Sequence, residues 1–146
     1  MKRKILVSII SIFITTSLFA NDLLLETIGA MGGSNIYLTY MSIGVIADSY
    51  TKEIYDKEQT VSLITVIERQ ARVQKDYFEK MMKSNDIPSE EKVFIKKMIE
   101  CYTFLIDESK YLVEYVNTGK ESSAKNFQAK REQAWKIISE ILGLNE

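Results

Sequence analysis

Apolar residues recur along most of this chain at spacings of three and four, which is the period of one face of an α-helix. The clearest stripe follows Thr60 and consists of Ile64, Ile67, Ala71, Gln74, Phe78 and Met81. No stretch shows the sustained alternation of apolar and polar residues that is typical of a half-buried strand. The pattern therefore predicts an all-α fold.

Four stretches carry this helical period, and short connections separate them. The predicted helices cover residues 34–57, 60–84, 89–118 and 123–142. The third opens on Ser89 and two acidic residues, which suit a helix start, and it stops before Gly119. Long helices with short connections pack as antiparallel neighbours, so we expect an up-down-up-down four-helix bundle. This bundle would form a single domain, residues 21–146.

The residues before the first predicted helix contain three glycines, at positions 29, 32 and 33. Glycine lowers helix propensity, whereas Ser34 is a good N-cap, so the first helix is predicted to begin at Ser34. Residues 23–31 would then form a short apolar lead-in that covers an end of the bundle or a partner surface. The alternative is one continuous helix from Leu23 that is kinked at the glycines.

The first 20 residues have the pattern of a secretory signal peptide. Three basic residues, at positions 2–4, precede a sixteen-residue uncharged run that ends at Ala20. A transmembrane helix is the alternative, but crossing the hydrocarbon core takes about 20 apolar residues. We therefore predict an exported protein, periplasmic or extracellular, with no stable membrane insertion after cleavage.

Composition excludes several kinds of chemistry. The chain has no His and a single cysteine, Cys101, so histidine-based catalysis, His-ligated metals and an intramolecular disulfide are excluded. Cys101 lies beside an apolar stripe and is interpreted as a small buried hydrophobe. Without residues 1–20 the chain keeps 16 basic and 20 acidic residues, a net charge of −4, which disfavours a nucleic-acid partner. We predict no catalytic residues, no metal and no cofactor.

The acidic residues include possible metal ligands and ion-pair partners. An all-carboxylate metal site would draw on Asp48, Glu68, Glu100 and Glu108, but these do not repeat on facing stripes, which favours solvated surface charges. Arg131 interrupts the stripe of the fourth helix, and in the predicted bundle it lies level with Asp48. This geometry predicts a buried Asp48–Arg131 ion pair. The alternative is that both side chains face water.

Four tyrosines, Tyr37, Tyr40, Tyr50 and Tyr55, lie in or near the first predicted helix. A tyrosine combines an apolar ring with a hydroxyl group that needs a partner, so it suits a ligand pocket between helices as well as ordinary packing. We interpret the four as the candidate ligand or partner surface.

The segments YLTYMSIGVIADSY, residues 37–50, and REQAWKII, residues 131–138, resemble the opening and closing helices of small exported bacterial helical-bundle proteins whose function is not established. The resemblance implies a four-helix bundle and supplies no activity. The predicted architecture alone is also similar to the extracytoplasmic four-helix sensing modules of bacterial chemoreceptors.

These observations favour an exported, non-enzymatic binding or interaction protein that uses a helix face or an inter-helix crevice. Its partner would be an unknown protein or a small ligand, and a second copy of the chain is a further candidate. The alternative is a carboxylate-dependent hydrolase acting on envelope glycan, which rests only on acidity and compartment.

Overall fold

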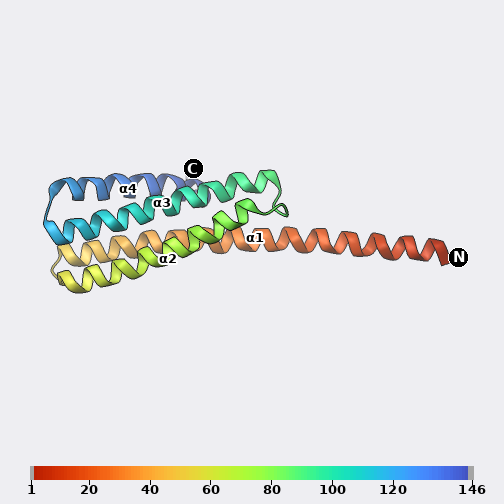
Figure 1. The fold of residues 1–146 in the computed structure, drawn as a ribbon, viewed down its shortest axis with the longest axis horizontal. Coiled ribbons are helices and arrows are strands. Elements are labelled where there is room, and N and C mark those ends of the chain that lie inside the picture. Colours follow the sequence, from red (N-terminus) through yellow and green to blue (C-terminus); the bar gives the residue numbers. More distant parts are fainter. Residues whose placement is uncertain (1, 145–146) are drawn as a thin grey trace. The chain divides into compact units, whose positions relative to one another are not determined.

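The computed structural model describes the backbone of residues 2–144 and the side chains of residues 23 and 25–144. Four helices account for almost all of this part of the chain, and none of it is a strand: α1 (Lys2–Thr51), α2 (Lys57–Lys83), α3 (Ser89–Thr118) and α4 (Glu121–Ile141). The all-α prediction is confirmed, and so is the four-helix bundle (Figure 1).

The chain divides into two units, residues 1–32 and residues 33–146. In the first unit the side chains of Leu23 and Met31 are both exposed, and Thr27 donates a hydrogen bond to the carbonyl oxygen of Leu23 at 2.7 Å. The predicted signal peptide, residues 1–20, lies outside the residues whose side chains are described. The second unit contains the end of α1 and the other three helices.

The predicted helix start at Ser34 is wrong, because α1 continues through all three glycines. Gly33 shows why a glycine is useful here. A Cβ atom at this position would lie 3.3 Å from Ile141 Cγ2 and 3.5 Å from Leu142 Cδ2, tighter than ordinary packing at the first contact. Gly33 therefore permits close packing of α1 against the end of α4, which offsets its low helix propensity.

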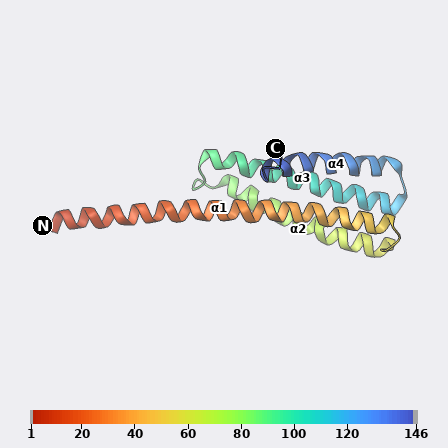
Figure 2. The same ribbon diagram turned by 180° about the vertical axis from the view of Figure 1, so that it is seen from behind.

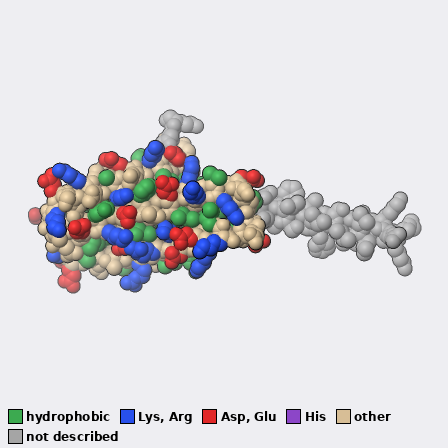
Figure 3. Space-filling view, turned by 45° about the horizontal axis from the view of Figure 1, so that its top comes forward, with side chains coloured by type: hydrophobic (Ala, Val, Ile, Leu, Met, Phe, Trp, Pro, Cys, Tyr) green, Lys and Arg blue, Asp and Glu red, His purple; other side chains and the backbone are tan. Residues whose placement is uncertain are grey.

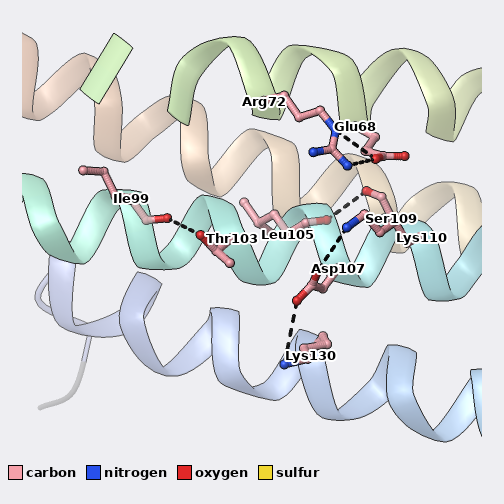
Figure 4. Close-up of polar contacts among 9 residues, drawn as sticks. All are labelled: Glu68, Arg72, Ile99, Thr103, Leu105, Asp107, Ser109, Lys110 and Lys130. Atoms are coloured by element: carbon pink, nitrogen blue, oxygen red, sulfur yellow. Dashed lines mark hydrogen bonds and ion pairs between the residues drawn. The ribbon is translucent and has the colours of Figure 1, made fainter. Parts of the chain in front are cut away.

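The core of the second unit is built around α3, which packs against both α2 and α4 (Figure 4). All seven residues of its predicted stripe are buried: Ile95, Met98, Tyr102, Leu105, Ser109, Leu112 and Val116. From α2 and α4 the core receives Ile64, Ala71, Phe78, Ala134, Ile137 and Ile138. For α3, the helical period thus identified residues that are removed from water.

Contacts between helices fix which positions face one another. The Tyr102 hydroxyl donates a hydrogen bond to Asn35 Oδ1 at 2.9 Å, and Tyr115 packs against Tyr50 further along the same two helices. Between α3 and α4, Lys97 pairs with Glu140 at 3.0 Å.

Helices α1 and α4 end in the same hydrogen-bond pattern. The N–H group of the second residue after the C-cap donates to the carbonyl oxygen of the residue five positions earlier. At the end of α1, Glu53 N–H bonds to the Tyr50 carbonyl at 3.0 Å, and Ile54 N–H bonds to the Ser49 carbonyl at 2.9 Å. This ending places the α1 terminus at Thr51 and corrects the predicted boundary at residue 57.

Helix α2 then begins at Lys57 rather than at the predicted Thr60. Asp56 is its N-cap, since one carboxylate oxygen accepts from Gln59 N–H at 2.8 Å while the Gln59 side chain accepts from Asp56 N–H at 3.1 Å. This reciprocal capping box stabilises the first turn of α2. The remaining predicted ends differ by one or two residues, and the α3 bounds are confirmed. Figure 2 shows that the α1–α2 and α3–α4 connections lie at the same end of the four-helix unit.

Basic and acidic side chains are intermixed on the face of the molecule in Figure 3. Along the helices, several ion pairs join residues one helical turn apart, including Lys75 with Glu79 at 2.9 Å and Lys125 with Glu121 at 2.8 Å. Exposed pairs of this kind contribute little to stability, so the fold depends on the apolar core.

Candidate functional site

A cavity of about 630 Å³ lies where α1 ends and α2 begins. Its lining comes from the last turn of α1, the connection, the first turn of α2 and one residue of α3: Tyr50, Thr51, Glu53, Ile54, Tyr55, Asp56, Gln59 and Tyr115. Three of these are tyrosines and two are acids. The lining contains neither lysine nor arginine, so its charged groups are both negative.

A second, smaller cavity of about 190 Å³ shares Tyr50, Thr51 and Tyr115 with the first. The rest of its lining is apolar apart from backbone: Ala47, Leu112, Ala124 and Phe127. Because three residues line both, we describe them together as the tyrosine crevice, with a polar outer part and an apolar inner part. A concave site with an apolar interior and a few polar groups is the usual form of a small-ligand site.

Tyr50 and Tyr115 separate the two parts of the crevice. Their rings meet edge to face, with centroids 6.4 Å apart, an arrangement that aromatic pairs prefer. Tyr115 lies one turn before the end of α3, where the Gly119 N–H bonds to the Tyr115 carbonyl at 2.7 Å. Gly119 has a φ of 67°, a left-handed conformation that suits glycine and stops the helix there.

The acidic side of the crevice is carried by the connection between α1 and α2. Glu53 has a φ of 58°, in the left-handed region that a non-glycine residue rarely occupies. The backbone bonds at the end of α1 and the capping box of Asp56 hold this segment from both sides. Both carboxylates are therefore attached to a fixed backbone, although both residues are exposed to water.

The structure divides the four tyrosines of the predicted surface. Tyr50 and Tyr55 line the crevice, where Tyr115 of α3 joins them. Tyr37 and Tyr40 lie further back along α1, and Tyr40 packs against Trp135 with ring centroids 5.5 Å apart. A ligand role for Tyr50 and Tyr55 stays a prediction, and the structure adds Tyr115 to the candidates.

Among the described residues, the most buried charged side chain lies away from the crevice. Glu108 of α3 is fully buried, and its Oε1 accepts a hydrogen bond from Arg131 Nη1 at 2.8 Å. Asp48, the predicted partner of Arg131, is exposed, so the predicted buried Asp48–Arg131 pair is wrong. The interpretation of Glu108 as a solvated charge is wrong as well. Glu108 lies one turn after Leu105 and one before Leu112, on the side of α3 that faces α4.

In this pair, Arg131 makes several close contacts, whereas one carboxylate oxygen of Glu108 has no hydrogen-bond partner among the described residues. Arg131 Nη1 also donates to the Tyr40 carbonyl at 3.2 Å, and the guanidinium lies 3.9 Å from the Tyr40 ring centroid. Gly44 leaves the space for it, because a Cβ there would lie 2.9 Å from Arg131 Nη1. The second carboxylate oxygen of Glu108, Oε2, is buried without a hydrogen-bond partner among the described residues.

Burial shifts the pKa of several groups in this region. It raises the pKa of Glu108 to about 7, although the hydrogen bond and the charge of Arg131 act in the opposite direction. It also raises the pKa of Cys101 to about 12, with a smaller contribution from Glu108. The thiol therefore stays protonated near neutral pH, and its sulfur lies 3.8 Å from the Ala134 carbonyl oxygen. The prediction that Cys101 is a small buried hydrophobe is confirmed.

Among the described residues, no three acidic or cysteine side chains come together as metal ligands. No helix in this part of the chain is long and apolar enough to cross a membrane.

Comparison of the chain with protein-family models, with curated protein sequences and with solved structures gives no match. The resemblance to small exported helical-bundle proteins therefore stays a prediction.

Proposed function

We propose that this chain is an exported, non-enzymatic binding protein whose tyrosine crevice takes a small ligand. The observation that carries the proposal is the pairing of a polar, aromatic outer cavity with an apolar inner one at the same end of the bundle. Such a crevice offers an apolar body a place out of water and offers a polar group several hydrogen-bond partners. Export rests on the charge and hydropathy pattern of residues 1–20.

We also infer an up-down-up-down order for the helices. The contacts between α1 and α3 support it, because Asn35 meets Tyr102 while the later Tyr50 meets the later Tyr115, so these two helices run in the same direction. The ion pair of Lys97 with Glu140 supports opposite directions for α3 and α4, since an early residue of one meets a late residue of the other. This order brings the ends of α1 and α3 together at the crevice.

The glycan hydrolase remains the alternative function, and Glu53 with Asp56 would be its carboxylates. Hydrolysis of a glycosidic bond needs one carboxylic acid that stays protonated, usually through burial. Both residues are exposed, and Asp56 is engaged in capping α2. These features favour binding over hydrolysis.

A second copy of the chain is a further proposed partner. Exposed apolar side chains lie on one face of α1 (Leu38, Met41 and Val45) and on one face of α2 (Leu63, Val66 and Val73). Contiguous apolar faces of this kind occur at protein interfaces. Sedimentation velocity tests this partner: the wild type is expected to dimerise at micromolar concentration, and a Leu38→Glu, Val45→Glu variant to remain monomeric.

Thermal unfolding tests the ligand proposal with three probes that share a short apolar body: cyclohexanol, hexanoate and butyltrimethylammonium. A ligand that binds only the native state raises the melting temperature, so at least one probe should stabilise the wild type. Ala124→Leu fills the inner part of the crevice and should remove the effect. Ala129→Leu, on an exposed position of the same helix, is the matched control and should keep it.

Two outcomes would contradict the proposal. One is an Ala124→Leu variant that responds to the probes as strongly as the Ala129→Leu control. The other is the failure of all three probes to stabilise the wild type at millimolar concentration.

A further inference from the structure

We propose that the ligand of the tyrosine crevice is a small organic cation, an alkylated ammonium group that carries a short apolar body. This inference rests on the proposed binding function and narrows its ligand class. It follows from the charge and the aromatic content of the crevice, taken together with the position of its apolar inner part.

Charge complementarity is the first argument. The outer cavity is lined by Glu53 and Asp56, and no basic residue offsets them within the lining. An anion entering this space would meet two carboxylates, whereas a cation is attracted by both. Asp56 keeps this capacity while capping α2, because a carboxylate has two oxygens and the cap uses only one of them.

The aromatic content is the second argument. Tyr50, Tyr55 and Tyr115 all line the outer cavity. The face of an aromatic ring attracts a cation within about 6 Å of its centroid, and several rings around one site are the common solution for alkylated ammonium groups. A primary ammonium group holds its hydration water strongly, so in a cavity that is open to solvent it gains little from contact with the rings. An alkylated ammonium group is more weakly hydrated, and the cavity therefore favours it.

The apolar inner part is the third argument, because it specifies the body of the ligand. Leu112, Ala124 and Phe127 offer no charge and no side-chain hydrogen-bond partner. A hydrocarbon group that enters the inner part, beside the Tyr50–Tyr115 pair, would be removed from water there, while the cation stays among the tyrosine rings and the carboxylates. The crevice thus matches a molecule with a cationic head and a short apolar tail.

The tyrosine crevice differs from the other charged feature of the protein, the Glu108–Arg131 pair. That carboxylate already has a cationic partner and lies in the packed core. Glu53 and Asp56 have no salt-bridge partner within 4.0 Å among the described residues, so their charges remain available to a ligand.

Isothermal titration of the full chain with butyltrimethylammonium, choline and 3,3-dimethylbutan-1-ol tests the inference. The last compound has the shape of choline with a neutral carbon in place of the nitrogen, so this pair isolates the charge. We expect both cations to bind and the neutral compound to bind more weakly by roughly 2- to 30-fold, the range that cation–aromatic attraction produces. Affinity for the cations should fall as salt concentration rises.

Amino-acid substitutions test which residues of the crevice contribute to cation binding. Glu53→Gln combined with Asp56→Asn removes both charges and keeps the cap of α2, since asparagine is also a good N-cap residue. This double variant should weaken butyltrimethylammonium binding several-fold, whereas Glu90→Gln, an exposed acid in the first turn of α3, should not. Tyr115→Leu should weaken binding as well, and Tyr77→Leu, on an exposed part of α2, should leave it unchanged.

Equal binding of choline and its neutral counterpart would overturn the cation assignment and leave the binding function standing. Cation affinity that survives the loss of both carboxylates would also overturn the assignment. A failure of the proposed function looks different, because then none of the three titrants binds and the Ala124→Leu variant behaves like the wild type with every probe.

Discussion

At the scale of single residues, the buried Glu108–Arg131 pair should be sensitive to substitution. Arg131→Met removes the only basic partner that Glu108 has among the described residues and leaves a buried carboxylate. We expect a loss of about 3–5 kcal/mol in unfolding free energy at pH 8. The double variant Glu108→Leu, Arg131→Met should lose much less, because neither charge remains.

Chemical denaturation of the two single variants and the double variant gives the coupling energy directly. A coupling near zero would contradict the pairing of these two side chains. The Asp48→Asn variant is the control: Asp48 is exposed, so its substitution should change stability by less than about 0.5 kcal/mol.

The same carboxyl group predicts how stability depends on pH. The pKa of Glu108 is about 7 in the folded protein, above the ordinary value of 4.5, so the folded state binds the proton more tightly than the unfolded state. Its contribution to stability is therefore complete below pH 4.5 and is lost as the pH rises to about 7, by roughly 3 kcal/mol. The groups around it are Arg131 of α4, Tyr40 of α1 and Cys101 of α3.

Unfolding free energies measured at intervals between pH 4 and pH 8 test this expectation. The wild type should lose stability across that range relative to Glu108→Gln, which has no proton to exchange at this position. Parallel curves for the two proteins would show that Glu108 does not titrate in this window.

The sequence predicted half of this cluster. Arg131 interrupts an apolar stripe, and this signal correctly placed it near the core. Its partner, Glu108, was missed because the predicted stripe of α3 runs from Leu105 to Ser109 and then to Leu112. These steps of four and three residues pass over position 108. Glu108 is one turn from both leucines, and that spacing is the signal that identifies it as buried. Whether Asp48 of α1 or Glu108 of α3 reaches Arg131 depends on how these two helices are rotated about their axes relative to α4, which periodicity does not fix.

At the scale of secondary-structure elements, the end of α1 is the least typical feature. Two helices end with the same backbone pattern, but Gly143 occupies the left-handed position after α4, whereas Glu53 occupies it after α1. A side chain at this position costs about 1 kcal/mol relative to glycine. Glu53→Gly should therefore stabilise the protein by up to about 0.5 kcal/mol, since the greater freedom of glycine in the unfolded chain offsets much of the gain.

Thermal and chemical denaturation measure the change in stability, and titration with butyltrimethylammonium measures the change in affinity for the cation. The variant loses one of the two carboxylates of the crevice and should bind the cation more weakly. Gly143→Ala provides the reciprocal control, because it should destabilise the end of α4 without changing the crevice. A destabilised Glu53→Gly protein would contradict this account of the helix end.

The ends of helices could be predicted where the usual helix-capping residues mark them. Ser89 and Gly119 gave the correct bounds of α3. The end of α1 was placed six residues too late because no glycine stands at the left-handed position. The start of α2 was missed although its signal is present in the sequence: Asp56 and Gln59 have the spacing of a capping box.

At the scale of the whole molecule, the sequence predicted four helices and the composition of their core, since both follow from local spacing. The crevice did not follow from it. Its two central residues, Tyr50 and Tyr115, are 65 positions apart, and the cavity beside them depends on where α1 stops and where the connection to α2 turns. Two tyrosines of the predicted surface line the crevice, and the two earlier ones face a different part of the bundle.

The central claim, that the tyrosine crevice is a binding site, is tested most directly by fluorine NMR of the full chain with 3-fluorotyrosine at its eight tyrosines. Each signal is assigned by a single Tyr→Phe substitution, and butyltrimethylammonium, hexanoate and cyclohexanol are then added in separate titrations. The account predicts that the signals of Tyr50, Tyr55 and Tyr115 shift with one common affinity while that of Tyr77 stays in place. Shifts confined to Tyr77 and Tyr37, or no shift at all, would contradict it.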